Sequence, residues 1–212
     1  MFNFYETIDR KKLKQFPKNE YFKLPLRCVV ASPSGSGKSN TILYMISLLN
    51  RCFTRIIICT KEDEALYDHL KDKIRGVEIH LNGSIPSIKE YDTETSKLII
   101  FDDLVLESRK VQSQIADFCI RGRKAGFSMC YLSQVYYGIP KSIRVNAQYC
   151  ILGRNLTKRD LNMIVREYEG DLEKDELIRL YKRETAEPLS TIMIDMVGRK
   201  IYRNLIEYVS DL

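Results

Sequence analysis

The sequence has no hydrophobic run long enough to cross a membrane. Its longest apolar runs have the length of strands, well short of the roughly 20 residues that a membrane-spanning helix needs. The first residues, from Met1 to Glu6, also lack the pattern of a signal peptide. We therefore expect a soluble, intracellular protein without a membrane partner.

Cysteine pairs with the spacing of metal ligands are absent as well. A zinc site is therefore not expected. The six cysteines mostly lie inside apolar runs, so they are predicted to be small buried thiols in a reducing compartment. They are Cys28, Cys52, Cys59, Cys119, Cys130 and Cys150.

Low-complexity stretches are lacking too. The chain has 212 residues, of which 44% are hydrophobic, enough to fill the core of one sizeable domain. The net charge of +6 is compatible with a polyanionic partner, but a solvated surface explains it equally well. We therefore predict a single domain over residues 26–212.

Residues 1–25 differ from the rest and are predicted to form a basic, aromatic N-terminal arm. The run Arg10-Lys11-Lys12 and further lysines alternate with Phe and Tyr side chains. Such an arm could contact nucleic acid, because bases stack on aromatic rings and phosphates pair with lysine. It could equally pack on a neighbouring subunit or cover an edge of the sheet.

The chain does contain a phosphate-binding loop. The apolar run from Leu26 to Ala31 leads into Ser32-Pro33-Ser34-Gly35-Ser36-Gly37-Lys38-Ser39-Asn40, where only Ser32 departs from the GxxxxGK[ST] pattern, in place of the first glycine. Its glycines allow a tight turn whose N–H groups face one concavity. An apolar strand before the loop and an apolar helix after it argue against a flexible linker. We expect residues 32–40 to bind ATP.

Within this loop, two side chains have predicted chemical roles. Lys38 should reach the β- and γ-phosphates as a point charge. Ser39 should offer its hydroxyl to Mg²⁺, at a helix N-terminus whose positive end favours phosphate.

Two acids end a later buried strand, which runs from Lys97 to Asp103. In P-loop folds, an acid at the carboxyl end of such a strand lies beside the loop and holds Mg²⁺ through water. Asp102 fits that role. Asp103 points differently and is predicted to orient or polarise the attacking water, a task more often given to glutamate. Gln134 follows the strand at residues 127–133 and is predicted to sense the γ-phosphate or the water.

The remaining pattern predicts an α/β fold with a mostly parallel sheet flanked by helices and a C-terminal hairpin. Further strands are expected at residues 55–60, 77–81 and 147–152, and hairpin strands at 191–196 and 200–203. Helices are expected over residues 63–74, with Asp63 as a cap, 105–120, 160–168 and 172–184. Residues 84–96 are expected to be a loop with at most one helical turn.

Taken together, these motifs resemble the FtsK–HerA superfamily of P-loop ATPases. The resemblance rests on the loop at 32–39, the Asp102-Asp103 strand, the Gly-Arg-Lys-Ala-Gly run at 122–126, the strand ending at Gln134, and the continuation at 138–147. Within that superfamily, the compact length and the double aspartate resemble the genome-packaging ATPases of poxviruses, other large DNA viruses and virophages. The resemblance covers residues 26–155.

The resemblance implies a RecA-like core, ATP hydrolysis with Mg²⁺, and a homo-oligomeric ring, a pentamer or hexamer, that translocates double-stranded DNA. Viral genome packaging would add capsid proteins as partners and place the protein at a cytoplasmic assembly site of the host or in the virion. Such rings complete each site with an arginine from the next subunit; Arg121, Arg123 and Arg154 are candidates, with Arg123 the first choice. Lys141, Arg144, Lys158 and Arg159 are predicted to contact DNA.

Two other functions stay open at this point. A small-molecule or nucleoside kinase also uses a P-loop, and Arg179, Lys182 and Arg183 could form its lid. A nucleotide-gated assembly protein would form its ring on ATP without moving DNA. Hydrolysis that DNA stimulates, without a phosphoryl acceptor, distinguishes the predicted motor from both.

Overall fold

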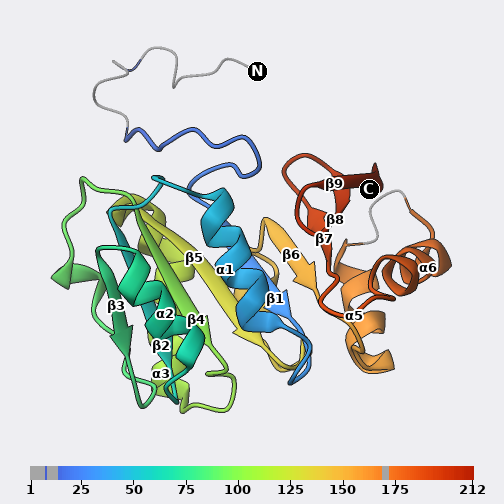
Figure 1. The fold of residues 1–212 in the computed structure, drawn as a ribbon, viewed down its shortest axis with the longest axis horizontal. Coiled ribbons are helices and arrows are strands. Elements are labelled where there is room, and N and C mark those ends of the chain that lie inside the picture. Colours follow the sequence, from blue (N-terminus) through green and yellow to red (C-terminus); the bar gives the residue numbers. More distant parts are fainter. Residues whose placement is uncertain (1–7, 9–13, 169–171) are drawn as a thin grey trace.

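The structure, a computed structural model, describes residue 8 and residues 14–168 and 172–212. These residues form a sheet with the strand order β3-β2-β4-β5-β1-β6-β7-β8-β9 (Figure 1). The strands are β1 (Arg27–Ala31), β2 (Arg55–Thr60), β3 (Val77–His80), β4 (Lys97–Asp102), β5 (Phe127–Ser133), β6 (Tyr149–Leu152), β7 (Ile192–Asp195), β8 (Lys200–Arg203) and β9 (Glu207–Asp211).

The sheet is parallel from β3 to β6 and antiparallel from β6 to β9. The prediction of an α/β fold with a mostly parallel sheet is confirmed, and so is the C-terminal hairpin, formed by β7 and β8. Strand β9 was not predicted. Its residues are exposed or half-buried, so it has no buried, alternating face that would mark it in the sequence.

Most helices lie close to the predicted positions but differ in their starts, and the short helix at residues 141–144 was not predicted. They are α1 (Lys38–Leu48), α2 (Ala65–Lys73), α3 (Arg109–Arg121), α4 (Lys141–Arg144), α5 (Lys158–Tyr168) and α6 (Lys174–Glu184), with 3₁₀ turns at η3 (Ile88–Glu90) and η4 (Gly122–Ala125). The predicted cap Asp63 is wrong, because Glu64 is the N-cap of α2. Helix α3 begins four residues later than predicted, where Ser108 accepts a hydrogen bond from the Val111 amide.

Helices cover both faces of the sheet. In β1, Cys28 and Val30 pack with α1 and α2 in one buried cluster. Val29 and Ala31 point to the other face and belong to the cluster that α3, α5 and α6 complete. Because both faces are covered, the central strands are nearly continuous apolar runs rather than alternating ones.

The strand order brings three loops to one edge of the sheet. Strand β5 pairs with β1 on one side and β4 on the other, all parallel. Parallel strands end at the same edge, so the segments after β1, β5 and β4 meet there. These segments carry the phosphate-binding loop, Gln134 and Asp103.

The described part of the N-terminal arm lies at the opposite end of the strands (Figure 1). Phe22 is buried and its ring meets Tyr149 edge-on, 5.2 Å between centroids. Asn19 donates a hydrogen bond to the Leu48 carbonyl at the far end of α1 from the loop, 2.8 Å away. The basic run at residues 10–12, on which the predicted nucleic-acid contact depends, lies outside the described residues.

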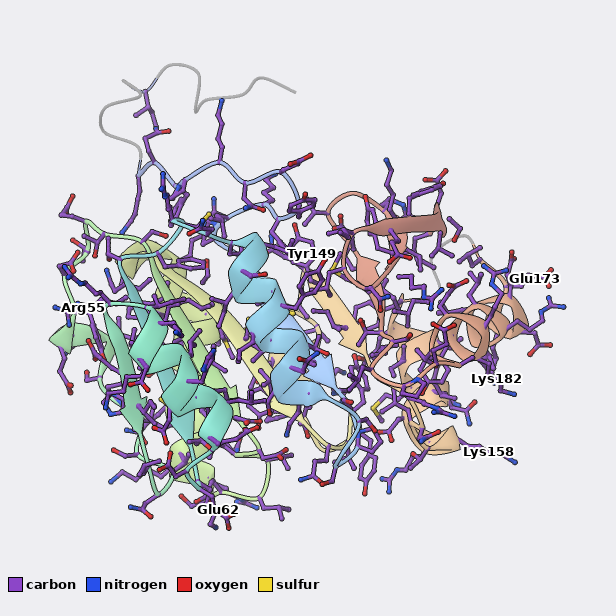
Figure 2. The ribbon with its side chains drawn as sticks, in the orientation of Figure 1. Arg55, Glu62, Tyr149, Lys158, Glu173 and Lys182 are labelled. Atoms are coloured by element: carbon purple, nitrogen blue, oxygen red, sulfur yellow. The ribbon has the colours of Figure 1, made fainter. Side chains whose placement is uncertain are left out.

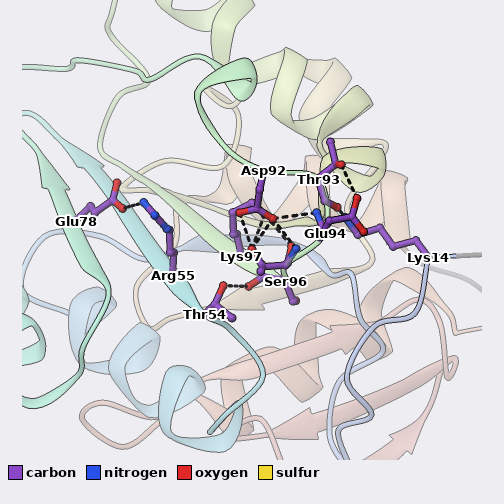
Figure 3. Close-up of polar contacts among 10 residues, drawn as sticks. Lys14, Thr54, Arg55, Glu78, Asp92, Thr93, Glu94, Ser96 and Lys97 are labelled. Atoms are coloured by element: carbon purple, nitrogen blue, oxygen red, sulfur yellow. Dashed lines mark hydrogen bonds and ion pairs between the residues drawn. The ribbon is translucent and has the colours of Figure 1, made fainter.

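Polar contacts around the buried Lys97 and the loop before it tie this arm to the sheet (Figure 3). The side chain of Lys97, at the start of β4, is fully buried and donates to the Thr95 carbonyl at 2.8 Å. Its Nζ also lies 3.4 Å from an Asp92 carboxylate oxygen. Lys14 of the arm donates to the carbonyl of Thr93 in the same loop. The loop between β3 and β4 is therefore held by charges at the end of the sheet that lies away from the phosphate-binding loop.

All six cysteines are buried free thiols, as predicted. Burial raises the pKa of the Cys59 thiol to about 12, so this side chain stays a neutral thiol. Within the part of the chain that the structure describes, every helix is too short or too polar to span a bilayer.

Candidate nucleotide-binding site

The phosphate-binding loop connects β1 to α1 through two glycines in left-handed backbone. Gly35 has φ 73° and Gly37 has φ 84°, a region that residues with a Cβ rarely adopt. Gly37 is also the N-cap of α1. A Cβ built on it would overlap the Leu189 side chain, which packs on the loop from the α6–β7 connection. Any other residue here would have a strained backbone and would displace the Leu189 side chain.

The loop forms one wall of a cavity of about 390 Å³. Predicted site residues from all three loops at this edge of the sheet line it, together with Glu64, Leu66 and Leu189. The predicted ones are Pro33, Ser34, Gly35, Gly37, Lys38, Ser39, Asn40, Asp102, Asp103 and Gln134. Residues about 65 positions apart in the chain thus meet at one site.

Ser32 lies outside this cavity. It is buried, and its amide donates to the Ser133 carbonyl at 3.0 Å, which extends the pairing of β1 with β5. Its side chain lies against Gly153, where any Cβ would overlap the Ser32 hydroxyl. Gly153 therefore provides the space that lets a serine replace the first glycine of the motif. Ser36 does not line the cavity either.

Lys38 lies between the loop and the two acids. Its ammonium is 3.0 Å from Asp102 Oδ1 and pairs also with Asp103 Oδ2. The Lys38 side chain is only 10% exposed, so these contacts are screened much less than surface pairs. A bound polyphosphate would compete with both carboxylates for this cation.

Asp102 has a buried environment in which both carboxylate oxygens have partners. Oδ1 faces Lys38, and Oδ2 accepts a hydrogen bond from the Tyr67 hydroxyl at 2.7 Å. Burial, with the nearby Asp102 charge as the next cause, raises the pKa of Tyr67 well above its ordinary value. Tyr67 therefore keeps its proton and remains a donor.

Asp103 shares the Lys38 ammonium with Asp102 but has its own hydrogen-bond partner. It has φ 52°, and its amide donates to the Leu132 carbonyl at 3.1 Å. Gln134 Nε2 donates to Asp103 Oδ2 at 2.9 Å. The Asp103 side chain is 34% exposed, against 7% for Asp102. One acid is thus buried beneath the site while the other is open to it.

Glu64 was not predicted as a site residue. It lies at the start of α2, and its carboxylate accepts a hydrogen bond from the Ser39 hydroxyl at 2.9 Å. Neither Glu64 nor Tyr67 belongs to a sequence motif. The available signal was weak: both follow β2, which ends beside the Asp102 end of β4.

The donor set at this site fits Mg²⁺. Among the described residues, no three His, Cys, Asp or Glu side chains form a metal cluster of their own. In a P-loop site the ion is held by the loop hydroxyl, an acid and phosphate oxygens. The Ser39 hydroxyl and the Asp102 carboxylate, both hard oxygen donors, line the same cavity. Asp102 Oδ1 is buried and makes no hydrogen bond, only the Lys38 ion pair.

None of the three candidate arginines lines the nucleotide cavity. Arg123 lies in η4 before β5, whereas Gln134 follows that strand, so the length of β5 separates them. Arg121 is exposed and lies 3.7 Å from Asp117. Arg154 lines a larger cavity beside α5 and α6. Arg123 therefore cannot act on the site of its own subunit.

The four predicted DNA contacts differ in accessibility. Lys141, Lys158 and Arg159 are exposed, and Figure 2 shows Lys158 at the α5–α6 end of the molecule, near Lys182. Arg144 is only 8% exposed. Its guanidinium donates to the Ile139 carbonyl at 2.8 Å and pairs with Glu167. The prediction that Arg144 contacts DNA is wrong, because its side chain is buried and forms an ion pair within the fold.

The residues considered for a kinase lid do not form a lid over the nucleotide cavity. Lys182 lines the larger cavity, of about 600 Å³, between α5 and α6. Arg183 pairs with its neighbour Glu184 at 2.5 Å. Neither side chain lines the nucleotide cavity, and neither does Arg179.

Comparison with known proteins gives one family. A family model described as "Poxvirus A32 protein" matches residues 13–195. None of the curated proteins matches the chain.

Solved structures share the fold. The genome packaging NTPase B204 from Sulfolobus turreted icosahedral virus 2, in complex with AMP, is 18% identical with a TM-score of 0.62, over 90% of this chain and 100% of that one. Its complex with ATP-gammaS matches at 17% identity and TM-score 0.62, over the same shares. The cytoplasmic domain of the Thermomonospora curvata Type VII secretion ATPase EccC is 13% identical with a TM-score of 0.60, over 87% of this chain and 25% of that one.

Proposed function

This chain belongs to the poxvirus A32 protein family, and we propose from that membership and from its site that it is an ATPase that translocates double-stranded DNA during viral genome packaging. The observation that carries the proposal is the position of Lys38, between a glycine turn that can wrap a phosphate and two acids at the end of β4. A cation so placed can bind the β- and γ-phosphates.

Each part of the site then has a task. The amides of residues 33–40 cradle the phosphates, and Lys38 neutralises their charge. Ser39 and Asp102 hold Mg²⁺, which when bound would offset the charge that develops on the phosphoryl oxygens. Asp103 takes the proton of the attacking water or orients it, and Gln134, bonded to Asp103 at 2.9 Å, relates the water to the γ-phosphate.

The ring and the DNA path are the finer part of the proposal. A neighbour's Arg123 completes each site by stabilising charge on the transferring phosphoryl group. Lys141, Lys158 and Arg159 are exposed and contact DNA phosphates, so binding is sensitive to salt and indifferent to sequence. Capsid proteins are the partners at the site of assembly in the infected cell.

ATP hydrolysis measured at increasing concentrations of double-stranded DNA tests the proposal. We expect ATP hydrolysis that rises when double-stranded DNA is added, measured as released phosphate together with native mass. K38A should abolish turnover, because no other cationic side chain among the described residues lines the cavity. Its circular dichroism spectrum should be unchanged. Retained turnover in K38A would remove this loop from the mechanism.

The same assay separates the two alternatives. Phosphate transfer to a nucleoside with no effect of DNA would favour a kinase. Hydrolysis that persists while DNA does not move, in a strand-displacement or tracking assay, would favour a nucleotide-gated assembly protein.

A further inference from the structure

The first turn of α2 contacts both predicted metal ligands. Glu64, its N-cap, accepts the hydrogen bond of the Ser39 hydroxyl at 2.9 Å. Tyr67, three residues later, donates its hydroxyl to Asp102 Oδ2 at 2.7 Å. One helical turn therefore bonds to the loop on one side and to the end of β4 on the other.

The local backbone holds the two side chains together. The Tyr67 amide donates to the Glu64 carbonyl at 2.8 Å, and residues three apart in a helix share a face. Tyr67 is fully buried, whereas Glu64 is half-buried and lines the nucleotide cavity. Strand β2 pairs with β4 in the register Thr60 to Asp102, which sets the position of the turn that follows.

The direction of each hydrogen bond matters for metal binding. A hydroxyl that donates its proton to a carboxylate turns its lone pairs the other way, and Ser39 donates to Glu64 rather than to Asp102. Asp102 has Oδ2 occupied by Tyr67, which leaves Oδ1 directed at Lys38. Partners outside the ligand shell fix ligand orientation in this manner in many metal sites.

We propose that Glu64 and Tyr67 are positioning residues that orient Ser39 and Asp102 for Mg²⁺. This inference rests on the proposed ATPase function, since it concerns the metal of that same site. Glu64 makes Ser39 present its oxygen to the ion, and Tyr67 holds the Asp102 carboxylate in one rotamer. Neither touches the reacting phosphoryl group in this assignment.

The test measures nucleotide binding rather than turnover. A fluorescent ADP analogue is titrated with each protein in EDTA, and again at increasing Mg²⁺. We expect E64A, which removes the acceptor of the Ser39 hydroxyl, and Y67F, which removes the donor to Asp102, to raise the Mg²⁺ concentration for half-maximal effect by about 10- to 100-fold, the usual cost of losing such a partner. Affinity for the analogue in EDTA should stay within about 3-fold, since Lys38 and the loop are unchanged.

Matched variants exist for both changes. E62A truncates an exposed glutamate in the same connection that does not line the cavity. Y91F removes another tyrosine hydroxyl, bonded to Glu78 at 3.1 Å, away from the site. Both should behave as wild type, and thermal unfolding of all four variants checks the fold.

The outcomes separate this inference from the proposed function. If wild type binds the analogue in a Mg²⁺-dependent way but E64A and E62A are indistinguishable, Glu64 has no positioning role while the ATPase proposal stands. If Y67F matches Y91F, the Tyr67 half is overturned. If wild type binds no nucleotide, both proposals fall. ATPase activity of E64A should recover at high Mg²⁺; a loss that persists there would make Glu64 a catalytic residue and overturn the assignment.

Discussion

At the scale of single residues, adjacent acids have opposite environments. Asp102 is buried and bonded to Tyr67, and Asp103 is partly exposed and bonded to Gln134. The positive φ of Asp103 turns the chain sharply after β4, so the two side chains differ in hydrogen-bond partner and exposure although both pair with Lys38. This division supports separate tasks for the two carboxylates, one for the metal and one for the water.

Replacing Asp103 tests that division. D103N keeps the size of the side chain and tolerates the left-handed backbone, since asparagine adopts it readily. We expect nucleotide affinity within a few-fold of wild type and hydrolysis slowed by at least about 100-fold, the usual contribution of a general base. Binding by fluorescence and turnover by phosphate release measure the two quantities.

The control for D103N is D63N, an exposed aspartate that precedes α2 and lies outside the cavity. Its turnover should equal that of wild type. Loss of nucleotide binding in D103N would instead assign the metal, or the Lys38 contact, to Asp103.

At the scale of elements, the positions of the strands could be predicted from the sequence, but their order in the sheet could not. The runs at Arg55–Thr60, Lys97–Asp102 and Phe127–Ser133 predict buried strands because both faces of each strand need apolar side chains. Whether β5 lies between β1 and β4 depends on packing between distant segments, which no local pattern encodes. The motifs nevertheless predicted most of the residues that line the nucleotide cavity, because the loop, the acids and Gln134 each follow a strand or end one.

The contacts missed from sequence are those made across elements. Glu64 and Tyr67 reach the site only because β2 lies beside β4, and Gly153 accommodates Ser32 only because β6 lies beside β1. From the sequence, Arg144 is expected to be exposed because it is basic. In the fold its side chain is buried and pairs with Glu167. Such contacts follow from tertiary packing rather than from spacing.

The turn into β5 gives a stability prediction. Gly126 has φ 86°, and a Cβ there would overlap the Thr95 carbonyl. Left-handed backbone costs alanine about 1–2 kcal/mol, and forcing an overlap adds about 1–3 kcal/mol. G126A should therefore lower the free energy of unfolding by several kcal/mol, measured by urea denaturation.

Gly35 provides the matched comparison. It also has a positive φ, 73°, but a Cβ there would meet nothing within 4 Å. G35A should cost only the backbone term, about 1–2 kcal/mol. An equal decrease in the free energy of unfolding for G126A and G35A would mean that the overlap with the Thr95 carbonyl costs no stability.

At the scale of the whole molecule, Arg123 and the nucleotide cavity lie at opposite ends of β5. A single copy cannot bring them together, so a role for Arg123 requires a second copy arranged head to tail. Such heterologous contacts close into rings when the rotation permits.

Mixing two inactive variants tests this arrangement. K38A lacks the loop cation but retains Arg123, and R123A has the reverse. Each should be inactive alone, and a 1:1 mixture should regain roughly a quarter of the sites if subunits associate at random around a head-to-tail ring. Phosphate release from the mixture measures the recovery.

R121A is the companion variant, since Arg121 is an exposed arginine two residues away, at the end of α3. It should be active alone. A mixture of K38A and R123A that stays inactive, or an R123A that is active alone, would exclude Arg123 from the neighbouring site.

The two outermost strands limit how copies can join. Strands β3 and β9 are only 4 and 5 residues long, and they carry Glu78, Glu207 and Asp211. Short strands with charged side chains resist edge-to-edge pairing. Sheets of neighbouring copies should therefore stay separate rather than merge into one continuous β-structure. The interfaces between copies should then be formed by helices and loops. Copies in such an assembly can tilt slightly relative to one another without breaking backbone hydrogen bonds between strands.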